Sequence, residues 1–208
     1  TNTTPSSTAK DEQTVPQIIP LFISSKKANP KDTFPKSSIW QKLKSAKLIR
    51  LPSYKGDAGE QLDIGTLCYN SENYQLALLW YWLAARQGHA EAQFLLGLLY
   101  EEGEIIGQDY AKAVRYFKRS AEQGFVLGQN NYAWMLIRGD GVEKNYEKGF
   151  KWYKLAAEQG FYKAQFVVGL AYFLGGWPSV AKQNFQEAVH WLRLSADQGD
   201  PDAQFYLG

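Results

Sequence analysis

The chain has 208 residues and a formal net charge of +2, with one cysteine and two histidines. One cysteine excludes an internal disulfide framework and a multi-cysteine zinc site. No stretch approaches the roughly 20 uninterrupted apolar residues that a membrane-spanning helix requires. An apolar content of 45% is enough for a packed core and argues against global disorder.

The small net charge hides two segments of opposite sign. Residues 1–56 contain ten Lys/Arg and three Asp/Glu, whereas the rest of the chain contains 13 and 18. The first segment also holds six of the eight prolines but only four of the 31 aromatic residues. A basic, proline-rich arm therefore precedes an acidic, aromatic-rich body.

The arm divides into two parts. Residues 1–35 are rich in Thr, Ser, Pro and Lys, which predicts a flexible tether. Residues 36–56 form a basic capping helix or linker, because apolar residues at helical spacing between 38 and 50 permit an amphipathic helix that Pro52 ends. No acidic residue interrupts its cations, which are Lys36, Lys42, Lys44, Lys47, Arg50 and Lys55.

Three roles compete for this basic segment. It could cap the open end of a repeat structure by packing Trp40 and Leu43 on the first unit, since solenoids need a polar-faced cap. It could instead bind an anionic membrane surface, to which each Lys or Arg adds about 1 kcal/mol. Nucleic acid is a third partner, but the acidic body would repel phosphates, so no nucleic-acid binding is expected.

The body repeats itself. A short pattern ending in Gln-Gly recurs at intervals of 36, 36 and 39 residues, and counting back 32 residues from its first glycine reaches Gly56. The recurring glycines are Gly88, Gly124, Gly160 and Gly199. This period predicts a repeat domain over residues 57–208, with units 57–88, 89–124, 125–160 and 161–199 and a truncated unit 200–208. Because the last unit is incomplete, we expect the natural protein to continue beyond Gly208.

Each unit is predicted to contain two antiparallel helices, here called helix A and helix B. Small and aromatic residues alternate at spacings of three to five, which is the helical period. In the second unit the predicted helices cover residues 89–102 and 110–123. Gln-Gly suits a helix C-terminus, and Asp200-Pro201 suits a helix start.

Small residues on helix A predict close packing between helices. Gly97 and its equivalents would let two backbones approach, while large rings fill the space between neighbouring pairs; these rings are Trp80, Tyr116, Trp152 and Trp191. A glycine inside a helix costs about 1 kcal/mol relative to alanine, so packing must offset it. Because a two-helix unit cannot bury its apolar face alone, the fold class is all-α, a right-handed α-solenoid of antiparallel helix pairs.

The repeat resembles the Sel-1-like repeat, a relative of the tetratricopeptide repeat. In the second unit, Ala92-Gln93, Leu96-Gly97, Tyr100, Gly103, Asp109-Tyr110, Lys112-Ala113, Tyr116-Phe117 and Ala121-Glu122-Gln123-Gly124 carry the resemblance. It implies a scaffold or adaptor that binds other proteins, often in bacterial cell-envelope, host-interaction or quality-control settings. A periplasmic or otherwise extracytoplasmic location is therefore expected, with the cytoplasm as the alternative.

The sequence assembles no nucleophile, base and orienting group, so no enzyme activity, catalytic residue, cofactor or metal is expected. Ser-x-x-Lys pairs such as Ser24–Lys27 and Ser179–Lys182 would suit a weak β-lactam-interacting hydrolase. However, a chain with 12 Ser and 17 Lys contains such pairs by chance, and no Lys-Thr-Gly accompanies them. The two histidines are expected to be structural or exposed, and Cys68 to be a buried small hydrophobe.

A partner is expected on the concave solenoid face, at helix A positions that the repeat does not fix. The primary hypothesis is a non-enzymatic protein-interaction scaffold that binds a peptide or a folded protein there. The alternative is an envelope-associated module that binds peptidoglycan or an anionic membrane surface. The candidate partner-binding residues are Asp63, Tyr69, Asn70, Glu101, Glu102, Asn131, Trp134, Met135 and Arg138. Trp134 could equally belong to the core or anchor a partner, and Arg138 lies one turn away.

Overall fold

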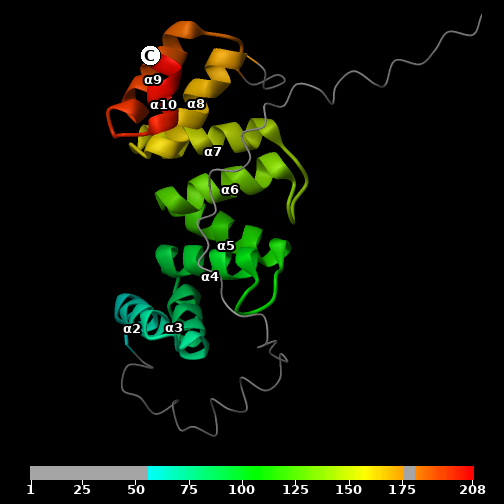
Figure 1. Ribbon diagram of the computed structural model, residues 1–208. Coiled ribbons are helices and arrows are strands. Elements are labelled where there is room, and N and C mark those ends of the chain that lie inside the picture. The colour runs from blue at the N-terminus through cyan, green and yellow to red at the C-terminus, as the bar shows by residue number, and fades with distance from the viewer. Residues whose placement is uncertain (1–55, 176–180) are drawn as a thin grey trace, which may run out of the picture.

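The computed structural model describes residues 56–175 and 181–208, and these residues are all-α. Figure 1 shows the helices stacked as antiparallel pairs, from α2 and α3 at one end to α8 and α9 at the other, followed by α10. The basic segment of residues 36–55 lies outside the described residues. The helices are α2 (Ala58–Asn70), α3 (Tyr74–Arg86), α4 (Ala90–Glu102), α5 (Tyr110–Glu122), α6 (Val126–Arg138), α7 (Tyr146–Glu158), α8 (Tyr162–Leu174), α9 (Phe185–Ala196) and α10 (Pro201–Leu207).

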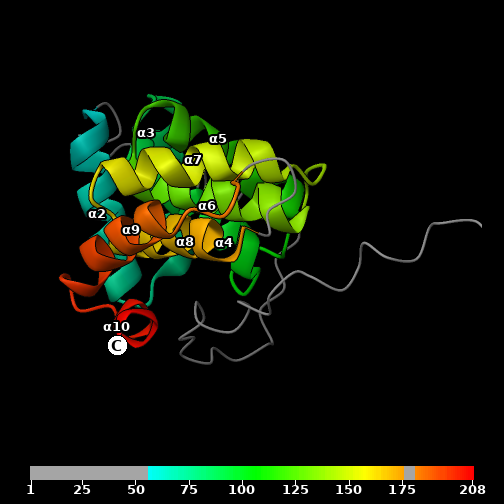
Figure 2. The same cartoon turned by 90° about the horizontal axis from the view of Figure 1, so that it is seen from above.

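Sequential packing builds the solenoid. Each helix packs on the next one in the chain, and α4 also contacts α6 directly. Figure 2, viewed along the stack, places helices B α3, α5 and α7 on one side and helices A α4, α6 and α8 on the other. The predicted all-α solenoid of antiparallel pairs is therefore confirmed. Within the described ranges, no helix is long and apolar enough to cross a membrane.

The predicted helix ends form as expected. After α3, the N–H of Gly88 donates to the Ala85 carbonyl and the N–H of His89 donates to the Ala84 carbonyl, both at 3.1 Å. Gly88 has φ +94°, so it supplies the left-handed residue that this C-terminal motif requires. At the start of α10, the Asp200 carboxylate accepts hydrogen bonds from the N–H groups of Asp202 and Ala203. Local sequence thus fixes where these helices stop and start.

The small residues of helix A face aromatic or branched side chains of helix B. A Cβ added to Gly97 would lie 2.5 Å from the Phe117 ring, and one added to Gly65 would lie 2.7 Å from the Tyr81 ring. The rings predicted to fill the space between neighbouring pairs, Trp80 and Tyr116, stand one position earlier in the chain than these contact residues. Trp80 is 2% exposed, and Tyr116 stacks on Tyr100 with ring centroids 5.7 Å apart. Successive side chains on a helix point in different directions. The residues after Tyr116 and Trp80, which are Phe117 and Tyr81, therefore place their rings on Gly97 and Gly65.

A row of buried glutamines connects the units. Gln93 on α4 is 6% exposed; its Nε2 donates to the Ala85 carbonyl of the preceding helix B at 3.1 Å. Its Oε1 accepts from Nε2 of Gln123, the C-cap of its own helix B, at 2.7 Å. The same pairing recurs as Gln87–Gln61, Gln159–Gln129 and Gln198–Gln165, and the same carbonyl bond recurs from Gln129, Gln165 and Gln204. The bond to the carbonyl thus ties each unit to the preceding one, and the Gln–Gln bond ties the two helices of one unit.

Candidate partner-binding surface

The C-terminal ends of α4 and α6 bring Glu101 and Arg138 into one charged surface. Arg138 Nε lies 2.7 Å from Asp140 Oδ2, and the Arg138 guanidinium carbon lies 5.3 Å from the centre of the Trp134 ring. Burial raises the pKa of the Glu101 carboxyl, the positive charge of Arg138 opposes that rise, and Glu102 and Asp140 add to it. Two predicted residues from different units, Glu101 and Arg138, therefore interact electrostatically.

The surface continues toward the first unit through Tyr69. Burial is the main cause that raises the pKa of the Tyr69 hydroxyl, and the negative charges of Glu102 and Glu104 raise it further. The Tyr69 and Tyr74 rings meet edge to face with centroids 5.2 Å apart. The pKa of Glu102 is itself raised, first by burial and then by repulsion from Glu104. An aromatic and acidic surface thus extends from α2 to α6, and Arg138 contributes a positive charge to it.

Not every predicted residue lies on this surface. Met135 is fully buried, at 0% exposure, in a cluster with Phe94, Phe117 and Leu136, so its side chain is not available to a partner. The equivalent positions Leu99 and Ala171 are also buried, because this side of helix A faces the preceding unit.

The other predicted residues keep some exposure. Trp134 is half-buried, and part of its ring packs against the core while Arg138 lies over it. Glu101 and Asn131 are also half-buried, and the exposed members of the set are Asp63, Tyr69, Asn70, Glu102 and Arg138. The Asn131 Oδ1 accepts a hydrogen bond from Asn130 Nδ2 at 3.1 Å. The binding role of these residues stays a prediction.

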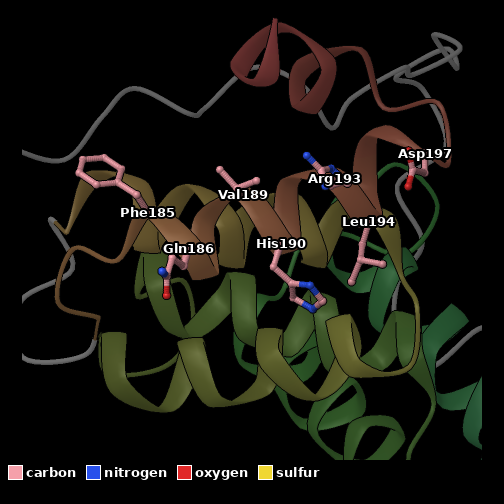
Figure 3. Close-up of a pocket in the computed structure, with 7 residues that line it drawn as sticks. All are labelled: Phe185, Gln186, Val189, His190, Arg193, Leu194 and Asp197. Atoms are coloured by element: carbon pink, nitrogen blue, oxygen red, sulfur yellow. The ribbon is translucent and has the colours of Figure 1, made fainter.

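A second surface feature, which the sequence does not predict, lies on α9. A groove of about 600 Å³ runs along α9, lined by Phe185, Gln186, Val189, His190, Arg193, Leu194 and Asp197 (Figure 3). Val189 is 42% exposed, although its equivalents Val114 and Phe150 are 7% and 6% exposed. Figure 3 shows Val189 and Arg193 directed toward α10 and His190 directed away from it. The residue type alone does not indicate the groove, because Val189 is apolar like its buried equivalents.

The described residues show little that could support bound metal. Among them, no group of three His, Cys, Asp or Glu side chains could hold a metal ion. His89 has a structural role, because its Nδ1 accepts a hydrogen bond from the Ala92 N–H at the start of α4. Cys68 is half-buried rather than fully buried, and burial raises the pKa of its thiol. Ser24, Lys27 and Ser179 lie outside the described residues.

The stacked helix pairs make this chain an α-solenoid repeat protein. The family model of the Sel1 repeat matches residues 68–89, 90–125, 126–161 and 163–200. The chain therefore belongs to the Sel1 repeat family, as the resemblance predicted. Proteins of this family generally act as scaffolds for protein–protein interaction and are generally non-enzymatic.

Solved structures agree with this assignment. A Sel1 repeat protein from Oxalobacter formigenes is similar with a TM-score of 0.68 and 31% identity, over 82% of this chain and 72% of that one. A protective antigen of uropathogenic Escherichia coli strains, which displays an SLR fold, is similar with a TM-score of 0.65 and 33% identity. That match covers 80% of this chain but only 34% of the antigen. No curated protein matches the chain.

Proposed function

We propose that this protein is a non-enzymatic scaffold that binds a peptide or a folded protein on the helix A side of the solenoid. The observation that carries the proposal is the Trp134–Arg138 pair beside Glu101, at the ends of two adjacent helices A. Tryptophan and arginine are enriched among the residues that dominate binding energy at protein interfaces. The direct contact between α4 and α6 supports the placement of the helices A on the inner side of the curve.

The charge and the apolar area of the surface indicate which side chains a partner would present. Glu101, Glu102 and Glu104 supply negative charge, and the half-buried Trp134 ring supplies a flat apolar surface. A partner segment with a Lys or Arg next to an apolar or aromatic side chain would match both. Glu101, Glu102 and Trp134 already stand on folded helices without a partner, which reduces the ordering cost of binding.

Quantitative affinity capture from an extract of the source organism tests the proposal. The baits are the full chain, Glu102→Lys and the control Glu143→Lys, which makes the same charge change at an exposed position before α7. We expect specific partners to be lost with Glu102→Lys, because it repels a basic segment, and retained with Glu143→Lys. Direct binding of each recovered partner to the purified variants then provides the affinities. Equal capture by all three baits would remove this surface from consideration.

The envelope-associated alternative depends on the basic segment of the arm. That segment lies outside the described residues except for Gly56, so binding to peptidoglycan or an anionic membrane, and an extracytoplasmic location, stay predictions. Sedimentation of the full chain with peptidoglycan or with anionic vesicles separates this alternative from a protein-binding scaffold.

A further inference from the structure

The first helix of the solenoid, α2, carries unusual residues on the side where a preceding unit would pack. Glu60, Asp63 and Leu67 follow one another at spacings of three and four, so they form one stripe along α2. All three are exposed, and Leu67 is 66% exposed. The Leu67 equivalents in later units, Leu99 and Met135, are 5% and 0% exposed. The stripe is therefore an interface position without its usual cover.

The contacts of later units show what normally covers this stripe. A Cβ added to Gly128, the equivalent of Glu60 on α6, would lie 2.4 Å from Ser120 Oγ of the preceding helix B. The other equivalents of Glu60 are also small and fully buried: Ala92, Ala164 and Ala203 are each 0% exposed. A regular helix B thus needs a small residue at this position. Glu60 blocks such close packing, because it would place an unpaired carboxylate in the interface.

The chain enters the solenoid at the point where a preceding helix B would end. The Gly56 carbonyl accepts a hydrogen bond from Gln87 Nε2 at 3.2 Å, and the Gly160 carbonyl accepts the equivalent bond from Gln198 Nε2 at 3.1 Å. Gly56 therefore occupies the place of the glycine that ends a helix B. Only residues 51–55 separate residues 38–50 from Gly56 in the sequence, so the effective concentration of that segment at the stripe is high.

Charge complementarity indicates which segment of the chain would cover the stripe. From its cap Asp57 to Asn70, α2 contains three acidic residues and no Lys or Arg. Residues 36–55 contain six Lys or Arg and no acidic residue. Apolar Ile39, Trp40 and Leu43 supply a matching surface for Leu67. An acidic stripe with one exposed leucine is thus complementary to a basic segment with an apolar side.

We propose that residues 38–50 of the same chain dock on the Glu60–Asp63–Leu67 stripe of α2 and close this end of the solenoid. The basic side chains face Glu60 and Asp63, and the apolar residues cover Leu67. The contact differs from a regular unit interface, because Glu60 keeps the segment farther from the α2 backbone than a helix B would lie. It is also weakened by salt, since its charges lie at the surface.

Paramagnetic relaxation in the full chain tests this docking. A nitroxide is attached to Ser45→Cys in an isotope-labelled Cys68→Ala chain, and amide signals are compared before and after reduction of the label. We expect selective broadening of amides of α2 and not of α9. The broadening of α2 should disappear with Asp63→Lys and with Leu67→Ser, and should persist with the control Glu143→Lys. Unchanged amide signals elsewhere verify that each variant is folded.

Three results would overturn the proposal. The first is an absence of broadening on α2, and the second is equal broadening of α2 and α9. The third comes from mixing an unlabelled chain that carries the nitroxide with an isotope-labelled chain that lacks it. If α2 of the second chain is broadened as strongly as in the single-chain experiment, the occupant is the arm of another copy and not that of the same chain.

Discussion

The interior of the solenoid and its two ends share one helical scaffold but differ in chemistry. Interior units place Ala92 or Gly128 where the first helix has Glu60. At the other end, α9 and α10 keep residue types of the interior, although Val189 is 42% and Phe205 is 82% exposed. Position 60 has thus changed its residue type, whereas α9 and α10 have not. The helix pattern itself is constant along the described residues.

The largest expected effect on stability comes from placing a glutamate, the residue at position 60 of the first helix, at the equivalent interior position 92. Ala92 is 0% exposed, so Ala92→Glu would bury a carboxylate without a partner and lower the free energy of unfolding by about 4 kcal/mol or more. Glu60→Ala, at the equivalent exposed position, should change it by less than about 0.5 kcal/mol. Denaturant unfolding followed by circular dichroism measures both. Similar losses for the two variants would contradict the distinction between end and interior.

The glutamine row provides a second comparison between interior and end. Gln93→Met keeps the volume but removes the bonds to the Ala85 carbonyl and to Gln123, and we expect a loss of about 2 kcal/mol. The bond of Gln204 to the Ala196 carbonyl is exposed to solvent, so Gln204→Met should cost less than about 0.5 kcal/mol. Urea unfolding midpoints are the measurement. A neutral Gln93→Met variant would show that shape alone connects the units.

The helix ends and the repeat period could be predicted from the sequence, because they depend on local chemistry. The sequence predicts helices over 89–102 and 110–123 in the second unit, and the structure has them at Ala90–Glu102 and Tyr110–Glu122. The burial of Met135 could not be predicted from the difference in residue type between units. Such a difference does not indicate which way a side chain points, and neighbouring helix positions point about 100° apart. The bond between Gln93 and Gln123 joins residues 30 positions apart, so it depends on tertiary packing that no local pattern encodes.

The free-energy cost of replacing the glycine that ends a helix B depends on local backbone conformation. It should therefore be the same in the first unit and in the interior. Gly88 and Gly124 have φ values of +94° and +84°, and a Cβ on either would meet nothing within 4 Å. Gly88→Ala and Gly124→Ala should therefore each lower the free energy of unfolding by about 1 kcal/mol, the cost of a left-handed non-glycine residue. Thermal and urea unfolding of the two variants provide the comparison. A markedly larger loss at Gly124 would indicate that neighbouring units contribute to this turn.

The smallest expected effect is a pH-dependent change in stability that has opposite signs on the helix A surface and the helix B surface. Burial raises the pKa of Glu101 in the folded chain, so the charged carboxylate disfavours folding at neutral pH and this penalty disappears as pH falls below the usual carboxyl range. Glu101→Gln should accordingly raise the melting temperature slightly at pH 7, and the gain should vanish in acid. On α7, Lys151 lowers the pKa of Glu147, so Glu147→Gln should have the opposite sign, with its small loss at pH 7 also fading in acid. Thermal melts of both variants across the acidic range distinguish the two surfaces, and a shared sign would refute the assigned causes.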